Sequence, residues 1–235
     1  MLNSDRFLNA FNSIELYLRK FTKQGKETRF YALVDLASNS NPAIRRSKDD
    51  LKEFADLRNA IIHERTDGRV LAEPNDKAVN EIERINSLLL NPPKVIPQFQ
   101  DKVYSLFVND PIAKAVEVML AQSYSQIPIY DSSIFVGLLT ANTVTRWLGA
   151  CVTEEILSLT DTSIANVLAY TEDKDNFSFL GRASTIFEAL ERFQIYQKKG
   201  KRLEAILITQ NSKSSEVLLG IISNWNLPKI HEILG

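Results

Sequence analysis

An internal repeat in the C-terminal part of the chain is the feature that most constrains the fold. Gly137-Leu-Leu-Thr140 recurs as Gly220-Ile-Ile-Ser223, and Glu117 aligns with Glu188. Around each copy the apolar spacing predicts the order strand, helix, strand, strand, helix. The predicted elements are residues 103–107, 110–122, 126–131, 135–140 and 141–150, and then 176–180, 184–193, 203–209, 218–223 and 224–234. Two copies are too few for a solenoid, so we expect a pseudo-symmetric pair that shares one core.

A proline-rich stretch precedes the repeat. Residues 91–99 hold three of the eight prolines, and proline disfavours helix both in itself and in the residue before it. We therefore predict a stiff linker at residues 92–100. It would separate a domain at residues 1–91 from the pair at residues 101–235, with the first copy at about 101–160 and the second at about 161–235.

The segment before the prolines has helical periodicity. Its apolar residues recur at steps of three and four, as in the first predicted helix at Phe7, Phe11, Ile14, Leu18 and Phe21. Similar stripes follow in three more stretches, which predicts a bundle of four helices. The expected fold class is α+β, with an N-terminal all-α helical bundle followed by a tandem β-α-β-β-α pair.

The composition excludes several classes of protein. With one cysteine and two histidines, the chain cannot form an intrachain disulfide framework, and a Cys-rich or His-rich metal site is not expected. No apolar run is long enough to span a membrane, and the N-terminus does not read as a signal peptide, so we expect a cytoplasmic protein. The net charge of −1 leaves contact with RNA to local basic clusters at Arg19–Arg29 and Arg45–Lys48.

The repeat resembles a pair of cystathionine-β-synthase (CBS) domains, known as a Bateman module. The resemblance rests on SQIPIYD and VGLLTANT in the first copy, and on EAILIT and LGIISNWN in the second. It implies a sensor that binds an adenosyl nucleotide such as AMP, ADP, ATP or S-adenosylmethionine between the copies, as a regulatory ligand and with no required cofactor. The other interpretation is a structural dimerisation unit whose pockets have degenerated.

The family's nucleotide site maps onto particular residues. Thr140 and Ser223 end a strand and open a helix, where a hydroxyl and free N–H groups suit a phosphate. The family then places an aspartate three residues later on the ribose hydroxyls, but this chain has Thr143 and Asn226 there. Because an asparagine still accepts and donates hydrogen bonds, we expect the working site at Ser223 and Asn226. The adenine would lie against the strands, at residues that include Ile127, Pro128, Ala205 and Ile206.

Two tryptophans fall on the second predicted helix of each copy. Trp147 and Trp225 hold corresponding places, and a large aromatic side chain there most often packs in a core or an interface. We therefore expect packing for both and no stacking on a ligand.

The helical segment carries a second resemblance, to the HEPN family of small helical domains. It rests on Arg58, Asn59 and His63, which match an arginine, a polar residue and a following histidine. Many such domains are metal-independent endoribonucleases, in which a histidine is the general base and an arginine stabilises the charge on the phosphate. In the alternative interpretation, Arg58 forms an ordinary ion pair with a nearby carboxylate. The domain is then inactive and binds a nucleotide or another protein.

Acid–base cleavage often uses one general base and one general acid, and the bundle has a single histidine per chain. A second chain would supply the second histidine. A homodimer would bring two Arg58–His63 sets into one cleft. We therefore expect a homodimeric regulatory protein whose CBS pair senses an adenine nucleotide and controls a HEPN-like bundle, for which the resemblance implies metal-independent cleavage of RNA. The alternative is a non-catalytic, nucleotide-dependent adaptor that docks another protein.

Overall fold

The chain folds into two compact units, residues 1–93 and residues 94–235. A computed structural model describes residues 2–63, 65–66, 69–70, 73–154 and 158–235. The two units are considered separately below.

The first unit is helical, as the apolar stripes predict. Its elements are α1 (Asn3–Thr22), α2 (Phe30–Ser38), α3 (Pro42–Arg46), α4 (Lys48–His63), β1 (Arg65–Thr66), β2 (Arg69–Val70) and α5 (Asp76–Leu90). Phe7, Phe11, Ile14 and Leu18 are buried, whereas Phe21 is 40% exposed. The sequence did not predict α3, which begins because the side chain of Asn41 accepts hydrogen bonds from the N–H groups of Ala43 and Ile44.

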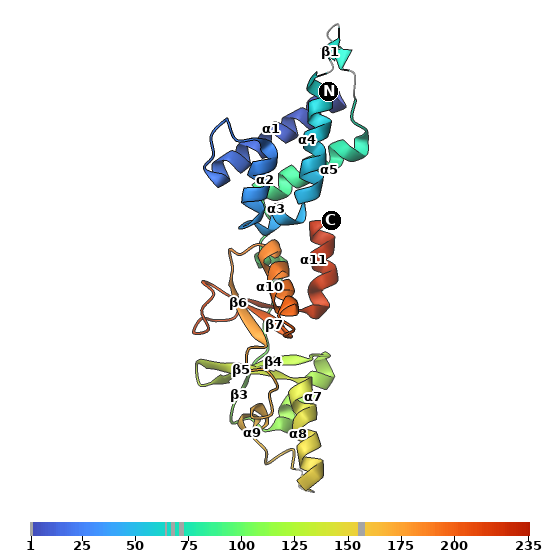
Figure 1. Ribbon diagram of the computed structural model, residues 1–235. Coiled ribbons are helices and arrows are strands. Elements are labelled where there is room, and N and C mark those ends of the chain that lie inside the picture. The colour runs from blue at the N-terminus through green and yellow to red at the C-terminus, as the bar shows by residue number, and fades with distance from the viewer. Residues whose placement is uncertain (1, 64, 67–68, 71–72, 155–157) are drawn as a thin grey trace. The chain divides into compact units, whose positions relative to one another are not determined.

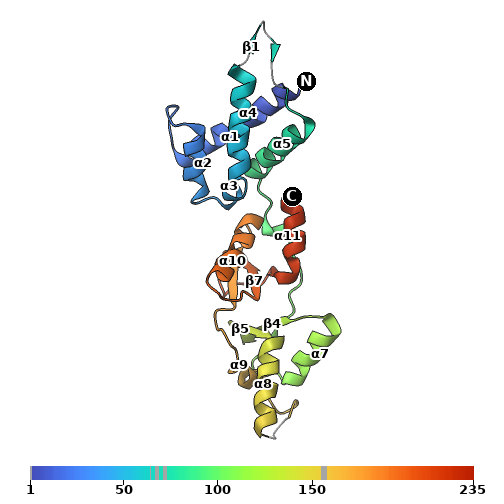
Figure 2. The same cartoon turned by 45° about the vertical axis from the view of Figure 1, so that its right-hand side comes forward.

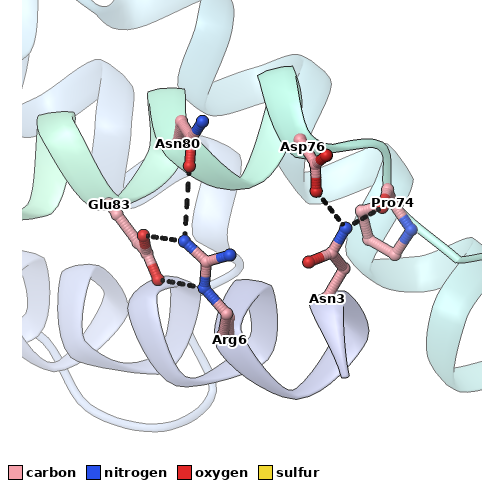
Figure 3. A network of polar contacts seen from close by, with 6 residues as sticks. All are labelled: Asn3, Arg6, Pro74, Asp76, Asn80 and Glu83. Carbon is pink, nitrogen blue, oxygen red and sulfur yellow. Dashed lines mark hydrogen bonds and ion pairs between the residues drawn. The ribbon is translucent and has the colours of Figure 1, made fainter. Parts of the chain in front are cut away.

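Polar contacts fix the first helix of this unit against the last (Figure 3). Arg6 forms a two-pronged ion pair with Glu83 of α5, with Nη2 2.6 Å and Nε 3.0 Å from its carboxylate oxygens. This bond holds the pKa of Glu83 below its usual value. One turn before Arg6, Asn3 donates to the Asp76 carboxylate and the Pro74 carbonyl. A planar guanidinium matched to a carboxylate sets the register of two helices as well as their contact.

The second unit contains the repeat in the predicted order. The first copy has β3 (Leu106–Phe107), α7 (Ile112–Gln122), β4 (Gln126–Asp131), β5 (Ile134–Thr140) and α8 (Ala141–Glu154). The second has β6 (Phe177–Gly181), α10 (Ile186–Lys198), β7 (Ala205–Thr209), β8 (Gly220–Ser223), η1 (Asn224–Asn226) and α11 (Leu227–Leu234). In each copy the first strand pairs parallel with the second, and the second pairs antiparallel with the third. Helices cover one face of each sheet (Figures 1 and 2).

Each copy begins with a segment that packs on the other copy. The helix α9 (Ile164–Leu168), which precedes β6, buries Ile164 and Val167 in the core of the first copy. In the same way Lys94 forms an isolated β-bridge with Thr185, and the Val95 N–H donates to the Ser184 carbonyl at 2.9 Å. The chain thus crosses to the second copy only after α9, a few residues beyond the predicted boundary near residue 160.

The proline-rich stretch is not a free linker over its whole length. The boundary between the units falls between Pro93 and Lys94, so most of the predicted linker belongs to the second unit. We call residues 94–104 the strap. It includes the short helix α6 (Val95–Gln98) and buries Val95, Ile96 and Phe99. Its apolar side chains explain this, because in water they are more stable packed on the second copy than exposed.

The strap crosses β8 at a residue without a side chain. An added Cβ on Gly220 would lie 3.1 Å from the carbonyl carbon of Phe99 and far inside the van der Waals distance of its oxygen. Directly after this crossing, the Asp101 N–H donates to the Leu219 carbonyl at 3.2 Å. Gly220 thus lets two backbones approach closely, which no other residue type would allow.

We predict that Gly220→Ala displaces the strap. The new methyl group meets backbone atoms that cannot rotate away, so the free energy of unfolding of the second unit should fall by about 1–3 kcal/mol, as for overpacked cores. Chemical denaturation of the full chain measures this change. Gly137→Ala is the matched control, because Gly137 holds the same position in the first copy and has nothing within 4 Å of an added Cβ. Equal losses for the two variants would contradict the crossing.

Candidate functional site

A cavity of about 370 Å³ opens beside the strap, and we call it the strap pocket. Three stretches line it: the strap itself, the turn from α7 into β4, and the end of β8 with the turn that follows. The lining residues are Gln98–Tyr104, Ser123–Gln126, Pro128, Ile221, Ser223, Trp225, Asn226 and Lys229. This volume lies within the range of roughly 300–1,000 Å³ of small-molecule sites. The pocket brings together Ser223, Asn226 and Pro128 of the predicted site.

Hydrogen bonds fix the polar end of this pocket. The Asn226 side-chain oxygen Oδ1 accepts from the Ser223 N–H at 2.8 Å and from the Ser223 hydroxyl at 3.3 Å. Asn224 also anchors the turn, since its amide donates to the Leu203 carbonyl at 3.2 Å. The Nδ2 group of Asn226 keeps its hydrogens unused among the described residues. The site therefore offers an amide donor where the family's aspartate would offer an acceptor.

The charges of the strap pocket come mainly from the strap. Asp101 is the one acidic residue among those that line it, and Lys102 and Lys229 are the basic ones. The Lys229 ammonium donates to the Gln98 carbonyl at 2.8 Å and lies 4.9 Å from the centre of the Phe99 ring. The Asp101 Oδ1 accepts from the Lys102 N–H at 2.7 Å. A carboxylate and two cations thus share one small cavity.

The first copy arranges its equivalent residues differently. Thr140 and Thr143 are both buried, with their hydroxyl oxygens 2.9 Å apart, and the Thr143 N–H donates to the Thr140 hydroxyl at 3.1 Å. Their polar groups therefore satisfy each other. Thr143 lines neither the strap pocket nor the smaller cavity next to it.

Aromatic side chains occupy the place that corresponds to the wall of the strap pocket. The strand registers pair Leu106 with Ile129 and Leu180 with Ile208, so Phe177 holds the position of Val103. The Phe177 ring contacts Phe135 of the first copy edge-on, with centroids 4.9 Å apart. Tyr130 and Phe179 complete this cluster around Phe135. Edge-to-face packing of this kind is favourable and fills space that Val103 leaves open.

A smaller cavity of about 200 Å³ adjoins the strap pocket. The two share Ser125, Gln126, Ser223 and Trp225. Thr140, the last residue of β5, lines the smaller cavity together with Arg202 and Glu204, which form an ion pair at 2.9 Å. Thr140 thus lines the cavity beside the strap pocket and not the strap pocket itself.

The two tryptophans behave differently. Trp147 is 4% exposed in the core of the first copy, which confirms packing there. Trp225 lies in η1 and is 84% exposed, so core packing is wrong for this residue. The reason is local: the hydrogen bonds between Ser223 and Asn226 close a tight turn that points the indole to the edge of both cavities.

The other residues predicted to contact the adenine are mostly buried in the core of the second unit. Ile127, Ala205 and Ile206 are fully buried in β4 and β7, so their side chains form the core behind the site. The sequence did not indicate a role for Asp101 and Lys102, because they directly follow the predicted linker. The apolar residues next to the prolines, Val95, Ile96 and Phe99, were the signal that this stretch packs on the second copy.

Of the predicted HEPN-like site in the helical unit, the structure describes the side chains of Arg58 and Asn59 only. Arg58 Nη1 donates to the Asn59 side-chain oxygen at 3.3 Å, and the buried Arg58 Nε lacks a hydrogen-bond partner in the part of the chain that the structure describes. His63 ends α4, and its side chain lies outside the described residues.

The basic clusters of this unit are partly neutralised. Arg19 pairs with Glu15 and bonds the Gly25 carbonyl, and Lys48 pairs with Asp35 at 2.9 Å. Lys20, Lys23, Lys26 and Arg29 are exposed. A local positive surface therefore remains at the end of α1 and the loop after it.

The described residues hold no group of three or more His, Cys, Asp or Glu side chains that could bind a metal ion. Within the same residues no helix is both long and apolar enough to cross a membrane.

Comparison with protein families identifies part of the second unit. Residues 99–150 match the model of the CBS domain. The match begins in the strap and ends in α8, and it does not extend to the helical unit. No curated protein matches the chain.

Solved structures with a similar arrangement include a Vibrio cholerae protein described as an acetoin utilization protein (AcuB). It is 15% identical, with a TM-score of 0.46, and the match covers 60% of this chain and 91% of that one. A CBS-domain protein of Agrobacterium tumefaciens is 18% identical with a TM-score of 0.40, over 56% and 85% of the chains. CbpB, solved in complex with c-di-AMP, is 12% identical with a TM-score of 0.44, over 65% and 91%.

The two tryptophans allow a direct test of the site geometry. In a Trp147→Phe variant the only indole is Trp225, and we predict red-shifted fluorescence that iodide quenches strongly. In the reciprocal Trp225→Phe variant, Trp147 should emit at shorter wavelength and resist quenching. A protected Trp225 in the ligand-free protein would contradict the open edge of the strap pocket.

Proposed function

We propose that the chain is a nucleotide-sensing regulatory protein and that the strap pocket binds one adenine nucleotide. The observation that supports this most is that the strap supplies a wall of the pocket and two of its three charged groups, Asp101 and Lys102. Proteins with CBS domains are often nucleotide-binding regulators, and residues 99–150 of this chain match the model of that domain. The strap begins directly after the helical unit, so a ligand that contacts it acts on the segment that joins the two units.

The phosphate would bind at the end of β8. There the free Nδ2 hydrogens of Asn226 are donors, the Ser223 hydroxyl would turn its hydrogen from Asn226 Oδ1 to a phosphate oxygen, and Lys102 supplies positive charge. Donors held in place by a closed turn lose little freedom when a ligand binds, which favours affinity.

The ribose would bind to the strap. Asn226 uses its side-chain oxygen on the Ser223 N–H, so it has little left to accept from a ribose diol. Asp101 lines the same pocket and has one carboxylate oxygen, Oδ2, without a hydrogen bond among the described residues. We infer that Asp101 replaces the missing aspartate of the family motif, and that it does so from the strap.

The proposal implies one nucleotide per chain. In the first copy the equivalent threonines bond each other and an aromatic cluster fills the equivalent wall. A second, equal site would require breaking both of these arrangements.

Binding is tested by calorimetry on the full chain with AMP, ADP, ATP, S-adenosylmethionine and cyclic di-AMP. We expect at least one of them to bind with a stoichiometry near one, and Asp101→Asn to weaken it about tenfold, since the amide loses a charged hydrogen bond worth roughly 1.5–3 kcal/mol. Asp175→Asn is the matched control, because Asp175 is an exposed residue of the segment before β6. No heat and no thermal stabilisation at millimolar concentrations would contradict the proposal.

We further propose that the helical unit is the output of the sensor. Its candidate group is Arg58, next to Asn59; its buried Nε lacks a hydrogen-bond partner among the described residues. The planar guanidinium suits an anionic partner such as a phosphate of RNA. His63, the base that the resemblance implies, and dimerisation, which would supply a second set, are part of the same proposal.

Metal-independent RNA cleavage is the catalytic form of this output. We expect the full chain to cut structured RNA in EDTA, and Arg58→Ala and His63→Ala each to lower the rate about a hundredfold or more, as groups that stabilise transition-state charge and general acid–base groups usually contribute. Gel electrophoresis of labelled RNA with and without nucleotide measures the rate. Lys77→Ala is the control, since Lys77 is an exposed residue of α5. Intact RNA under every condition would leave the non-catalytic adaptor as the output.

A further inference from the structure

A second groove shares residues with the strap pocket. It has a volume of about 440 Å³ and lies along α7, and we call it the α7 groove. Lys102, Tyr104 and Tyr124 line both cavities, so the two adjoin across these three side chains. A ligand that fills the strap pocket would have Lys102 and two tyrosines beside its exposed end.

The side chains of the α7 groove suit a planar ring with hydrogen-bonding edges. Val118 and Ala121 provide an apolar surface, and Tyr104 and Tyr124 are each 41% exposed, which leaves ring area for stacking. Glu117 and Gln122 lie in the same groove. A carboxylate accepts from an exocyclic amine, and a carboxamide both donates and accepts, as on the edge of adenine.

The boundary between the cavities suits phosphate. Lys102 is the one cation that lines both, and no ion pair of its ammonium group exists among the described residues. The groove carries no other cation. Negative charge is therefore favoured between the two cavities and not at the far end of the groove.

The backbone around the groove is held before any ligand arrives. Ser123 ends α7 in the left-handed conformation with φ of 55°, and the Tyr124 N–H donates to the Met119 carbonyl at 3.0 Å. Tyr104 precedes β3, which pairs with β4. A backbone held in place in this way reduces the entropic cost of binding.

We propose that the α7 groove is a second subsite of the strap pocket, and that the ligand is an adenine dinucleotide whose two nucleosides are joined through phosphate. This rests on the proposed function, because the first adenosine occupies the strap pocket. The second base lies between the tyrosines and α7, and the linking phosphates lie at Lys102.

Calorimetry on the full chain with ATP and diadenosine triphosphate tests the proposal, because both probes carry three phosphates and only the second carries two adenosines. We expect diadenosine triphosphate to bind about tenfold more tightly, since stacking of a base on aromatic side chains contributes roughly 1–3 kcal/mol. Ala121→Trp fills the groove and should reduce the ratio of the two affinities to about one. Leu120→Trp is the control: Leu120 is 84% exposed on the same helix and does not line the groove, so the ratio should persist.

Three results would overturn the subsite. They are equal affinities for the two probes in the wild-type chain, a ratio that survives Ala121→Trp, and a ratio that Leu120→Trp abolishes as well. Each leaves the proposed function intact if ATP binds. Failure of both probes to bind would instead overturn the subsite and the nucleotide site together.

Discussion

The close crossing of two backbones at Gly220 is the constraint on which the candidate site depends. Because Gly220 has no Cβ, the Phe99 carbonyl lies directly over β8 and the chain continues into the Asp101 hydrogen bond to Leu219. A side chain at this position would lift the strap and remove one wall of the pocket. Gly220 also begins the strand that ends at Ser223, so one short strand both fixes the strap and presents the polar end of the site.

The two copies show how a repeat can keep its fold while the residues at equivalent positions come to pack differently. Both have the same strand pairings, which are set by backbone hydrogen bonds and buried apolar residues. Their sites differ at single positions: Phe177 fills the space that Val103 leaves open, and Thr143 bonds Thr140 where Asn226 keeps a free amide group. Packing density makes such changes decisive, since an extra aromatic ring occupies the volume that a ligand would need.

The periodicity of the sequence was enough to predict four helices of the first unit and the order of the repeat in the second, because burial of an apolar face determines them. The short helices α3, α6 and α9 were not predicted. Ser223 and Asn226 were likewise predictable from the turn that follows Gly220. The strap was not, because proline content indicates a stiff chain but not what the chain packs against. Asp101 could be assigned only after the crossing was known, and the exposure of Trp225 depends on hydrogen bonds within a turn of three residues.

The central claim is that a nucleotide in the strap pocket acts on the strap. Amide hydrogen exchange of the full chain, with and without saturating nucleotide, tests it most directly, because exchange reports local opening of backbone hydrogen bonds. The account predicts slower exchange at residues 94–104 and at Ser223–Asn226, with no change at residues 172–178. Protection confined to residues 172–178 and the start of α8, with the strap unaffected, would contradict it.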